Sequence, residues 1–130
     1  MALRAIHHVQ LAMPRGGEDR ARAFYSGFLG IPEVPKPEEM AARGGCWFEQ
    51  GPLRIHLGVE DDFRPARKAH PAILVDDLLG MLPGLIQKMP PGLGGGVRKS
   101  TVDVRPNGDA SFYLDDPFGN RIELIEPSDR

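Results

Sequence analysis

The sequence of 130 residues contains a single cysteine, Cys46, so no disulfide can form within the chain. One unpaired thiol is usual in a reducing compartment, and we therefore expect a cytoplasmic protein. The formal net charge of −2 provides no basic surplus for a phosphate backbone, so no nucleic-acid partner is expected. No apolar run reaches the roughly 18 residues of a membrane span, and residues 1–10 lack the apolar core of a signal peptide.

The composition that remains is that of an ordinary globular domain. Hydrophobic residues make up 41% of the chain and charged residues 26%, which is enough apolar material for a core and does not predict disorder. A length of 130 residues is close to the commonest domain size, so one compact domain is expected.

The first half of the chain predicts a strand, a helix and then further strands. Apolar residues at helical spacing indicate the helix, with Glu18 and Asp19 in its first turn and Gly30 at its end. Gly51-Pro52 separates the last two strands and indicates a hairpin. The expected elements are a strand at 4–13, a helix at 18–30, a loop or short edge segment at 31–39, and strands at 45–50 and 53–59.

The second half repeats this order after a charged linker that has no hydrophobic period. Pro83 and Gly84 lie inside the helical pattern, so this helix is expected to be short or kinked. The expected elements are a strand at 70–77, a helix at 78–89, a loop at 90–96, and strands at 98–104, 110–116 and 121–126.

An internal repeat of this kind predicts two copies of a βαβββ module within one domain. The modules are expected at about residues 1–60 and 68–130, joined by a linker at about 61–67. Each module has a sheet covered by a helix on one face. Pairing the two sheets gives a half-closed mixed sheet with a concave face and with helices outside, so the predicted fold class is α+β.

Two matching strands carry different polar residues at their centre. "RIHLGV" (54–59) and "RIELIE" (121–126) agree in Arg, Ile and Leu, but the first has histidine where the second has glutamate. Side chains alternate between the faces of a strand, and the apolar residues belong under a helix. The polar residues of the same parity therefore share the concave side. They are His8, His56, His70 and Glu123.

Three imidazoles and one carboxylate on a common face are suitable ligands for a divalent metal ion. Neutral imidazole and carboxylate bind iron, nickel, zinc or manganese, and the ligand type alone does not select among them. The alternative is a hydrated face of ordinary polar residues. The remaining histidine, His7, has the opposite parity and is expected at a strand edge.

Four stretches of the chain resemble one superfamily, and together they cover nearly all of it. They are "IHHVQLAM", "ARAFYSGFLGIPEV", "HPAILVDDL" and "FYLDDPFGNRIELIE", and the most specific part is "DPFGNRIEL". The sequence is similar to the vicinal oxygen chelate superfamily, which includes glyoxalase I, extradiol dioxygenases, fosfomycin-resistance thiol transferases and bleomycin-resistance proteins. The resemblance implies paired βαβββ modules around a divalent metal.

The resemblance also implies a ligand set. His8, His70 and Glu123 match the family's three ligand positions and are similar to the dioxygenase and fosfomycin-transferase sites. Glyoxalase I enzymes have a glutamate at the position of His56. Histidine there leaves room for a fourth ligand and disfavours the glyoxalase proton transfer, which needs a carboxylate base beside the metal. Glu123 and an unligated His56 are the candidates for a catalytic base.

Four further residues are candidates for contact with a substrate. By resemblance to the fosfomycin transferases, Tyr113 is expected to donate a hydrogen bond to the substrate, and packing in the barrel is its alternative. Ser111 shares the face of Tyr113 by parity. Gln10 lies two residues after His8 on the same face, and Trp47 has the parity of the open face.

These features fit more than one function. The first is a metal-dependent enzyme whose small substrate chelates the metal through oxygen, with lyase or isomerase, thiol-transferase or dioxygenase chemistry. The second is a non-catalytic protein that sequesters a small molecule or drug, as bleomycin-resistance proteins do. A closed structural metal site is the third. The edges of a half-closed sheet can be covered by a second copy, so a homodimer is expected, with no membrane partner.

Overall fold

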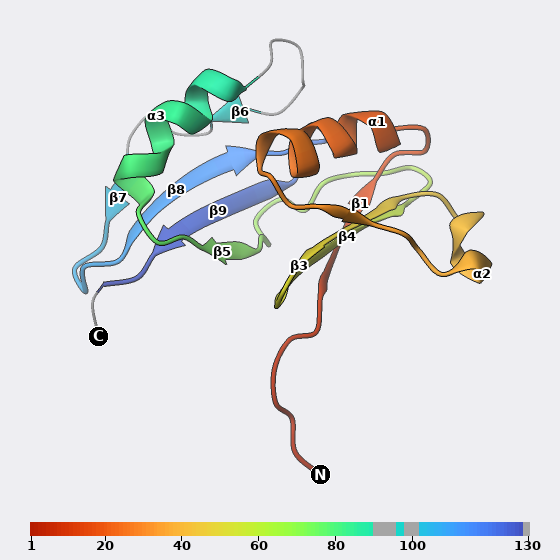
Figure 1. Ribbon diagram of the computed structural model, residues 1–130, viewed down its shortest axis with the longest axis horizontal. Coiled ribbons are helices and arrows are strands. Elements are labelled where there is room, and N and C mark those ends of the chain that lie inside the picture. Colours follow the sequence, from red (N-terminus) through yellow and green to blue (C-terminus); the bar gives the residue numbers. More distant parts are fainter. Residues whose placement is uncertain (90–95, 98–101, 129–130) are drawn as a thin grey trace. The chain divides into compact units, whose positions relative to one another are not determined.

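The computed structural model describes residues 1–89, 96–97 and 102–128 (Figure 1). The chain divides into two compact units, Met1–Arg64 and Pro65–Arg130, called unit 1 and unit 2 below. The division lies inside the segment expected to be the linker. Within the described ranges, no helix is both long and apolar enough to cross a membrane.

Unit 1 is a four-stranded sheet with a helix on one face. The strand order is β1-β4-β3-β2, in which β1 is parallel to β4 and the other neighbours are antiparallel. The elements are β1 (Val9–Met13), α1 (Glu18–Ala21), η1 (Arg22–Phe28), β2 (Glu33–Val34), α2 (Glu38–Ala41), β3 (Cys46–Gln50) and β4 (Leu53–Val59). The expected helix at 18–30 is thus present, as an α-helical turn that continues into the wider π-helical stretch η1.

The helix of unit 1 buries aromatic side chains against the sheet. Phe24, Tyr25 and Phe28 are almost fully buried, and the Tyr25 ring stacks on Phe48 of β3 with centroids 5.3 Å apart. Burying each such side chain contributes about 1.5–3 kcal/mol. In β4, Ile55 is buried under these rings by the same alternation. The helix therefore covers one face of the sheet and leaves the other face for the polar side chains.

A close approach between backbones fixes the start of β3. Gly45 has φ +89°, and a Cβ there would lie 2.1 Å from the carbonyl oxygen of Leu57. Only glycine fits such a position without displacing β4. The Gly45 N–H donates to Glu18 Oε2 at 2.9 Å, and this hydrogen bond lowers the pKa of the Glu18 carboxyl. The helix start and β3 are thereby tied together.

Unit 2 repeats the plan with two short strands at one edge. Its order is β5-β9-β8-β6, with β7 also paired to β8, and β5 is parallel to β9. The elements are β5 (Ala72–Leu74), α3 (Leu78–Lys88), β6 (Gly96–Val97), β7 (Asp103–Val104), β8 (Ala110–Asp115) and β9 (Arg121–Glu126). Figure 1 shows α3 lying along β8 and β9.

The helix α3 is anchored at its start and along one side. The Asp77 side chain accepts the Gly80 N–H at 3.1 Å as an N-cap, and Leu78, Leu82 and Leu85 are buried. They pack over the apolar side chains of β8 and β9, which are Phe112, Leu114, Ile122 and Leu124. The opposite face of this sheet is therefore available to polar residues.

A buried carboxylate holds the turn between β8 and β9. Asp116 is fully buried and accepts the backbone N–H groups of Phe118 and Asn120 at 2.9 and 2.8 Å. The Asn120 side chain donates to its other oxygen at 2.9 Å, and Gly119 has φ +92°. The motif "DPFGN" therefore forms the turn that fixes the β8–β9 register.

The predicted α+β class with repeated βαβββ units is confirmed. Three details differ from expectation. The proline-rich segment holds the short helix α2 in addition to the edge strand β2, the strand expected at 70–77 is only three residues long, and β6 lies at the end of a predicted loop. Pro83 is accommodated inside α3, which runs for 11 residues. The predicted loop at 90–95 and the predicted strand at 98–101 lie outside the described residues.

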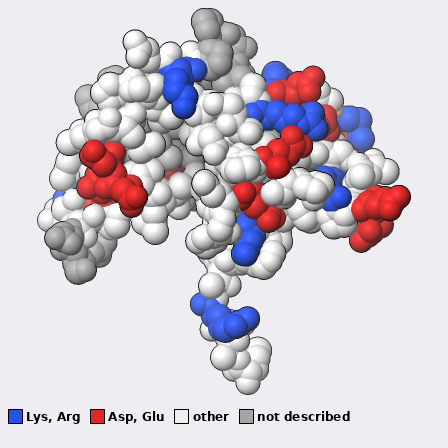
Figure 2. Space-filling view, viewed as in Figure 1, with Lys and Arg blue, Asp and Glu red and all other residues white. Residues whose placement is uncertain are grey.

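Figure 2 shows basic and acidic side chains interspersed over the face in view, without an extended area of one sign. This distribution agrees with the formal net charge of −2.

Candidate functional site

Glu123 lies in β9 on the sheet face turned away from α3. In the strand register it is opposite Tyr113 of β8 and beside Ala72 of β5. Its neighbours Ile122 and Leu124 point to the other face and are buried. Only 4% of Glu123 is exposed, so its charge must be met by hydrogen bonds or by a cation.

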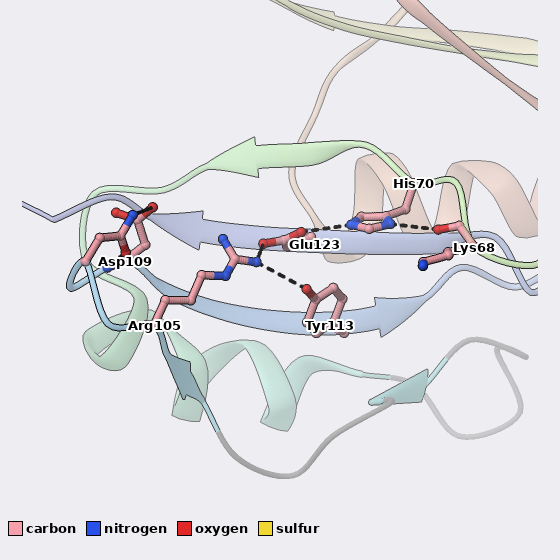
Figure 3. Close-up of polar contacts among 7 residues, drawn as sticks. Lys68, His70, Arg105, Asp109, Tyr113 and Glu123 are labelled. Carbon is pink, nitrogen blue, oxygen red and sulfur yellow. Dashed lines mark hydrogen bonds and ion pairs between the residues drawn. The ribbon is translucent and has the colours of Figure 1, made fainter.

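The His70 ring contacts Glu123 in a way that fixes which nitrogen carries a proton. His70 Nδ1 is 2.9 Å from the carbonyl oxygen of Lys68, and a carbonyl can only accept, so Nδ1 must donate. His70 Nε2 is 2.9 Å from Glu123 Oε1 (Figure 3). In the neutral ring Nε2 is then an acceptor that faces a second acceptor. The contact is favourable only if the ring is protonated or if a cation binds both atoms.

The geometry of this pair fits a divalent metal ion. Ligands roughly 2.0–2.2 Å from a metal and at right angles to each other lie about 3 Å apart. His70 Nε2 and Glu123 Oε1 have nearly that separation. A metal-bound histidine usually donates its second N–H to a carbonyl or carboxylate, as His70 Nδ1 does here.

Arg105 holds the other oxygen of the carboxylate. Its Nη2 donates to Glu123 Oε2 at 2.9 Å and lies 3.3 Å from the Tyr113 hydroxyl (Figure 3). The hydrogen bond to Glu123 is the main cause that raises the pKa of the Arg105 guanidinium. Glu123 is therefore held with Oε1 directed at His70.

Arg105 was not assigned from the sequence, because "RPNG" was interpreted only as a turn. Asp103 of β7 is opposite Ser111 of β8, so the alternation along the chain puts residue 105 on the same face as Ser111 and Tyr113. Extending the predicted strand by one residue would have found it.

Two buried polar atoms near this network lack a partner. Among the described residues, the only buried side-chain N or O atoms without a hydrogen bond are Ser111 Oγ and Arg121 Nε. Ser111, Tyr113 and Arg121 share one face of the sheet by their register. The guanidinium carbon of Arg121 is 6.0 Å from the centroid of the Tyr113 ring.

In unit 1 the corresponding face carries a stack of three rings. The His56 ring lies between Trp47, with centroids 3.9 Å apart and 4° between planes, and His8, at 4.2 Å and 19°. Trp47 and Gln10 are both direct register partners of His56. The Gln10 side chain covers Gly58, where an added Cβ would be 2.6 Å from Gln10 Nε2.

A carboxylate orients the central ring of this stack. His56 is 3% exposed, and its Nε2 is 2.7 Å from Glu49 Oε2, which can only accept when ionised. Nε2 therefore carries the proton, and Nδ1 has no hydrogen-bond partner among the described residues. A carboxylate behind an imidazole is the usual support of a metal-bound histidine. Glu49 is the second residue in the site that was not assigned from the sequence.

His8 is the exposed outer ring of the stack. Loss of water around the ring lowers the pKa of His8 from its ordinary value of 6.5, and the neighbouring His56 and His7 lower it further. The Nδ1 atoms of His7 and His8 are 3.0 Å apart. His8 thus favours the neutral form that a metal requires.

A small cavity of about 120 Å³ lies beside the stack within unit 1. Gln10 and Trp47 line it, together with Lys36, Met40 and Arg43. Drug-sized ligands usually occupy roughly 300–1,000 Å³, so this space suits part of a molecule.

The structure therefore places the predicted ligands on the expected faces as two pairs, His8 with His56 and His70 with Glu123. Within the described part of the chain, no group of three or more His, Cys, Asp or Glu side chains is gathered closely enough to hold a metal. The predicted substrate contacts lie on the same two faces, Gln10 and Trp47 in unit 1 and Ser111 and Tyr113 in unit 2. Their roles as ligands or substrate contacts stay predictions.

Comparison with known proteins gives the family. No protein-family model matches the sequence, and no curated protein matches it. Among solved structures, a protein assigned to the glyoxalase family from Bacillus anthracis has 45% sequence identity, with 98% of each chain covered and a TM-score of 0.85. The chain belongs to the glyoxalase family.

More distant structures share the fold of this glyoxalase family member. The genomically encoded fosfomycin resistance protein FosX from Listeria monocytogenes has a TM-score of 0.70 at 15% identity, covering 99% of this chain and 95% of its own. A glyoxalase/bleomycin resistance protein from Albidiferax ferrireducens has a TM-score of 0.65 at 17% identity, covering 93% and 97%. The resemblance to the vicinal oxygen chelate superfamily is confirmed.

Proposed function

We propose that this glyoxalase family member is a divalent-metal-dependent enzyme whose small substrate chelates the metal through oxygen. The observation that carries the proposal is the contact between His70 Nε2 and Glu123 Oε1. The two atoms lie 2.9 Å apart, both are acceptors when the ring is neutral, and each side chain is held from behind, His70 by the Lys68 carbonyl and Glu123 by Arg105. With a neutral His70 ring, this arrangement is favourable only around a bound cation.

The full ligand set would combine both pairs. His70 Nε2 and Glu123 Oε1 come from unit 2, and His8 with His56, through Nδ1, come from unit 1. The two units could belong to one chain or to two chains of a homodimer. Imidazole and carboxylate fit iron, nickel, zinc or manganese. When bound, the metal would act as a Lewis acid toward the substrate oxygen atoms.

The chain's own residues would orient the substrate and move protons. Tyr113, on the face of Glu123, would contact the substrate through its hydroxyl. Glu49 keeps the proton of His56 on Nε2, so Nδ1 is the atom that would accept a proton if it is not a ligand. Histidine at this position disfavours the proton transfer of glyoxalase I, which needs a carboxylate base beside the metal. Low isomerase activity on the glutathione hemithioacetal of methylglyoxal is expected.

A protein that only sequesters a drug is the alternative function. Such a protein would need the aromatic face of Trp47 and the adjacent cavity, but not the contact between His70 and Glu123. Metal binding therefore separates the two functions.

The test is the metal content of protein purified without chelators. We expect one divalent metal per ligand set in the wild type and in the control Glu39→Gln, because Glu39 is exposed in α2 and outside the set. His70→Ala should lose it. A His70→Ala protein that keeps one tightly bound metal would disprove the assignment.

We also propose a homodimer. Each sheet ends in its first strand, β1 or β5, which is hydrogen-bonded to one neighbour in its own sheet. Such edges are commonly covered by another chain segment. Light scattering that finds only monomer at micromolar concentration would contradict this.

A further inference from the structure

Two of the proposed histidine ligands have one ring nitrogen that is engaged by another protein group. His70 Nδ1 donates to the Lys68 carbonyl. His56 Nε2 donates to the Glu49 carboxylate. An imidazole that binds a metal usually gives its second N–H to such an acceptor, which fixes the tautomer and the direction of the ligating nitrogen. The same arrangement should exist at His8 if that ring is a ligand.

The group that engages the His8 ring is His7, its neighbour in the sequence. The two Nδ1 atoms are 3.0 Å apart, and the ring planes lie at 87° with centroids 5.2 Å apart. Two ring nitrogens at hydrogen-bond distance share one proton, so in the neutral rings one Nδ1 donates and the other accepts. His8 Nε2 has no hydrogen-bond partner among the described residues.

The direction of this hydrogen bond decides whether His8 can bind a metal. If His8 Nδ1 donates, the lone pair of Nε2 is free for a metal. If His8 Nδ1 accepts, Nε2 carries the proton and neither nitrogen has a lone pair to offer. Only the first direction is compatible with a ligand at this position.

The backbone of His7 is held by the sheet of unit 1. Arg54 of β4 donates from Nη1 to the His7 carbonyl oxygen at 3.1 Å. Neighbouring side chains of a regular strand point to opposite faces, so the contact between His7 and His8 requires that both lie outside β1, as they do. Residues 1–8 are all exposed, and exposed terminal segments are poorly ordered unless they are tied down. The hydrogen bond from Arg54 therefore helps to keep the His7 ring beside His8.

We infer that His7 is a positioning residue of the proposed metal site, because its Nδ1 accepts the Nδ1 proton of His8 and leaves His8 Nε2 to bind the metal. The inference rests on the proposed function, since it assigns the ligating atom of one proposed ligand. It also gives His7 the part that the Lys68 carbonyl has at His70 and that Glu49 has at His56.

A simpler role for His7 is to pack its ring against His8. Two substitutions separate the roles. His7→Phe keeps an aromatic ring but removes the acceptor, whereas His7→Asn removes the ring but keeps an acceptor oxygen. Residue 7 is exposed and lies outside β1, so both variants are expected to fold.

The first measurement is long-range ¹H–¹⁵N NMR of the histidine rings in chelator-treated protein at pH 8, where an ordinary imidazole is neutral. In the wild type and in His7→Asn, the proton of His8 should lie mainly on Nδ1. His7→Phe should lose that preference. A His8 proton mainly on Nε2 in the wild type would overturn the inference, as would the same tautomer in the wild type and His7→Phe.

The second measurement is calorimetric titration with Zn²⁺. His7→Phe should bind about tenfold more weakly than the wild type, which is the lower end of the range for losing an outer-shell partner, because water can reach this exposed ring and replace the acceptor. His7→Asn should stay within about threefold of the wild type. The exposed control Glu39→Gln should bind like the wild type. A larger loss in His7→Asn than in His7→Phe would overturn the inference. A failed metal assignment is recognised separately by the metal content of His70→Ala, whereas the tautomer of His8 is read without metal.

Discussion

The two units place different side chains at the same point of their last strand. In unit 1 it is His56, opposite Trp47, and in unit 2 it is Glu123, opposite Tyr113. The segment just before the first strand of each unit brings a histidine to that point, His8 before β1 and His70 before β5. Yet His8 stacks on the His56 ring, whereas the His70 ring contacts Glu123 through Nε2.

The difference shows what an internal repeat conserves. The strand register fixes the position of each side chain on the sheet. The type of residue at that position then determines which contacts its neighbours form. Unit 1 organises its residues by ring stacking with one carboxylate behind the central ring. Unit 2 organises a buried carboxylate by an imidazole and a guanidinium. Unit 2 should therefore provide most of the electrostatic attraction for a metal, and unit 1 mainly neutral ligands.

The largest expected effect comes from removing the central residue of each unit. Glu123→Gln should weaken Zn²⁺ binding by about 1,000-fold, more than the 10–100-fold typical of losing an outer-shell partner. His56→Ala should weaken it by roughly 10–100-fold, because a neutral fourth ligand is lost. Calorimetric titration of both variants checks this. Equal losses would show that the units contribute alike.

The next largest effect is a difference in how much stability two glycine-to-alanine substitutions cost, one in each unit. Gly45→Ala should destabilise the protein by at least about 3 kcal/mol, because the left-handed backbone and the contact with the Leu57 carbonyl both oppose a Cβ. Gly119→Ala should cost only about 1–2 kcal/mol, since its Cβ would meet a Pro65 side-chain atom at 3.3 Å that can move. Urea unfolding measures both. Similar costs would mean that the β3–β4 approach is looser than the structure shows.

A smaller effect on metal affinity is expected for Glu49, whose carboxylate contacts the His56 ring. Glu49→Gln keeps the shape of the side chain but removes the charge that holds the Nε2 proton, so Zn²⁺ affinity should fall by about 10-fold. Glu39→Gln, an exposed substitution in α2, is the matched control and should leave affinity unchanged. No loss in Glu49→Gln would show that His56 is not a ligand.

The smallest effect concerns Cys46, which is present only in unit 1. Burial raises the pKa of the Cys46 thiol from 9.0 to about 11. Between these values the unfolded chain ionises and the folded chain does not, so stability falls as the pH rises through that window. At pH 8 the folded thiol should resist a disulfide reagent. Rapid labelling at pH 8 of protein that remains folded would contradict the burial of Cys46.

Much of this organisation could be predicted from the sequence. Strand alternation put Gln10, Trp47, Tyr113 and the four proposed ligands on the open faces, because a period of two needs no tertiary information. The sequence could not predict that the helix would continue through Pro83. Its cost inside a helix is offset by the packing of Leu82 and Leu85.

The partners behind the proposed ligands could not be predicted. Arg105 follows a two-residue strand that propensity does not define, and Glu49 meets His56 only through the β3–β4 register. The helix α2 was also missed, since Pro35 and Pro37 suggested an irregular loop. Pro37 in fact directly precedes the helix, where the missing N–H costs nothing. Such contacts depend on register and packing, which composition does not encode.

The assignment of His70 as a metal ligand through Nε2 is tested most directly by long-range ¹H–¹⁵N NMR of the histidine rings. Before metal is added, the spectrum should show that Nδ1 of His70 carries a proton. One equivalent of Zn²⁺ should shift Nε2 to a metal-bound position while Nδ1 keeps its proton. Unchanged His70 nitrogens after Zn²⁺ addition, or binding through Nδ1, would contradict the assignment.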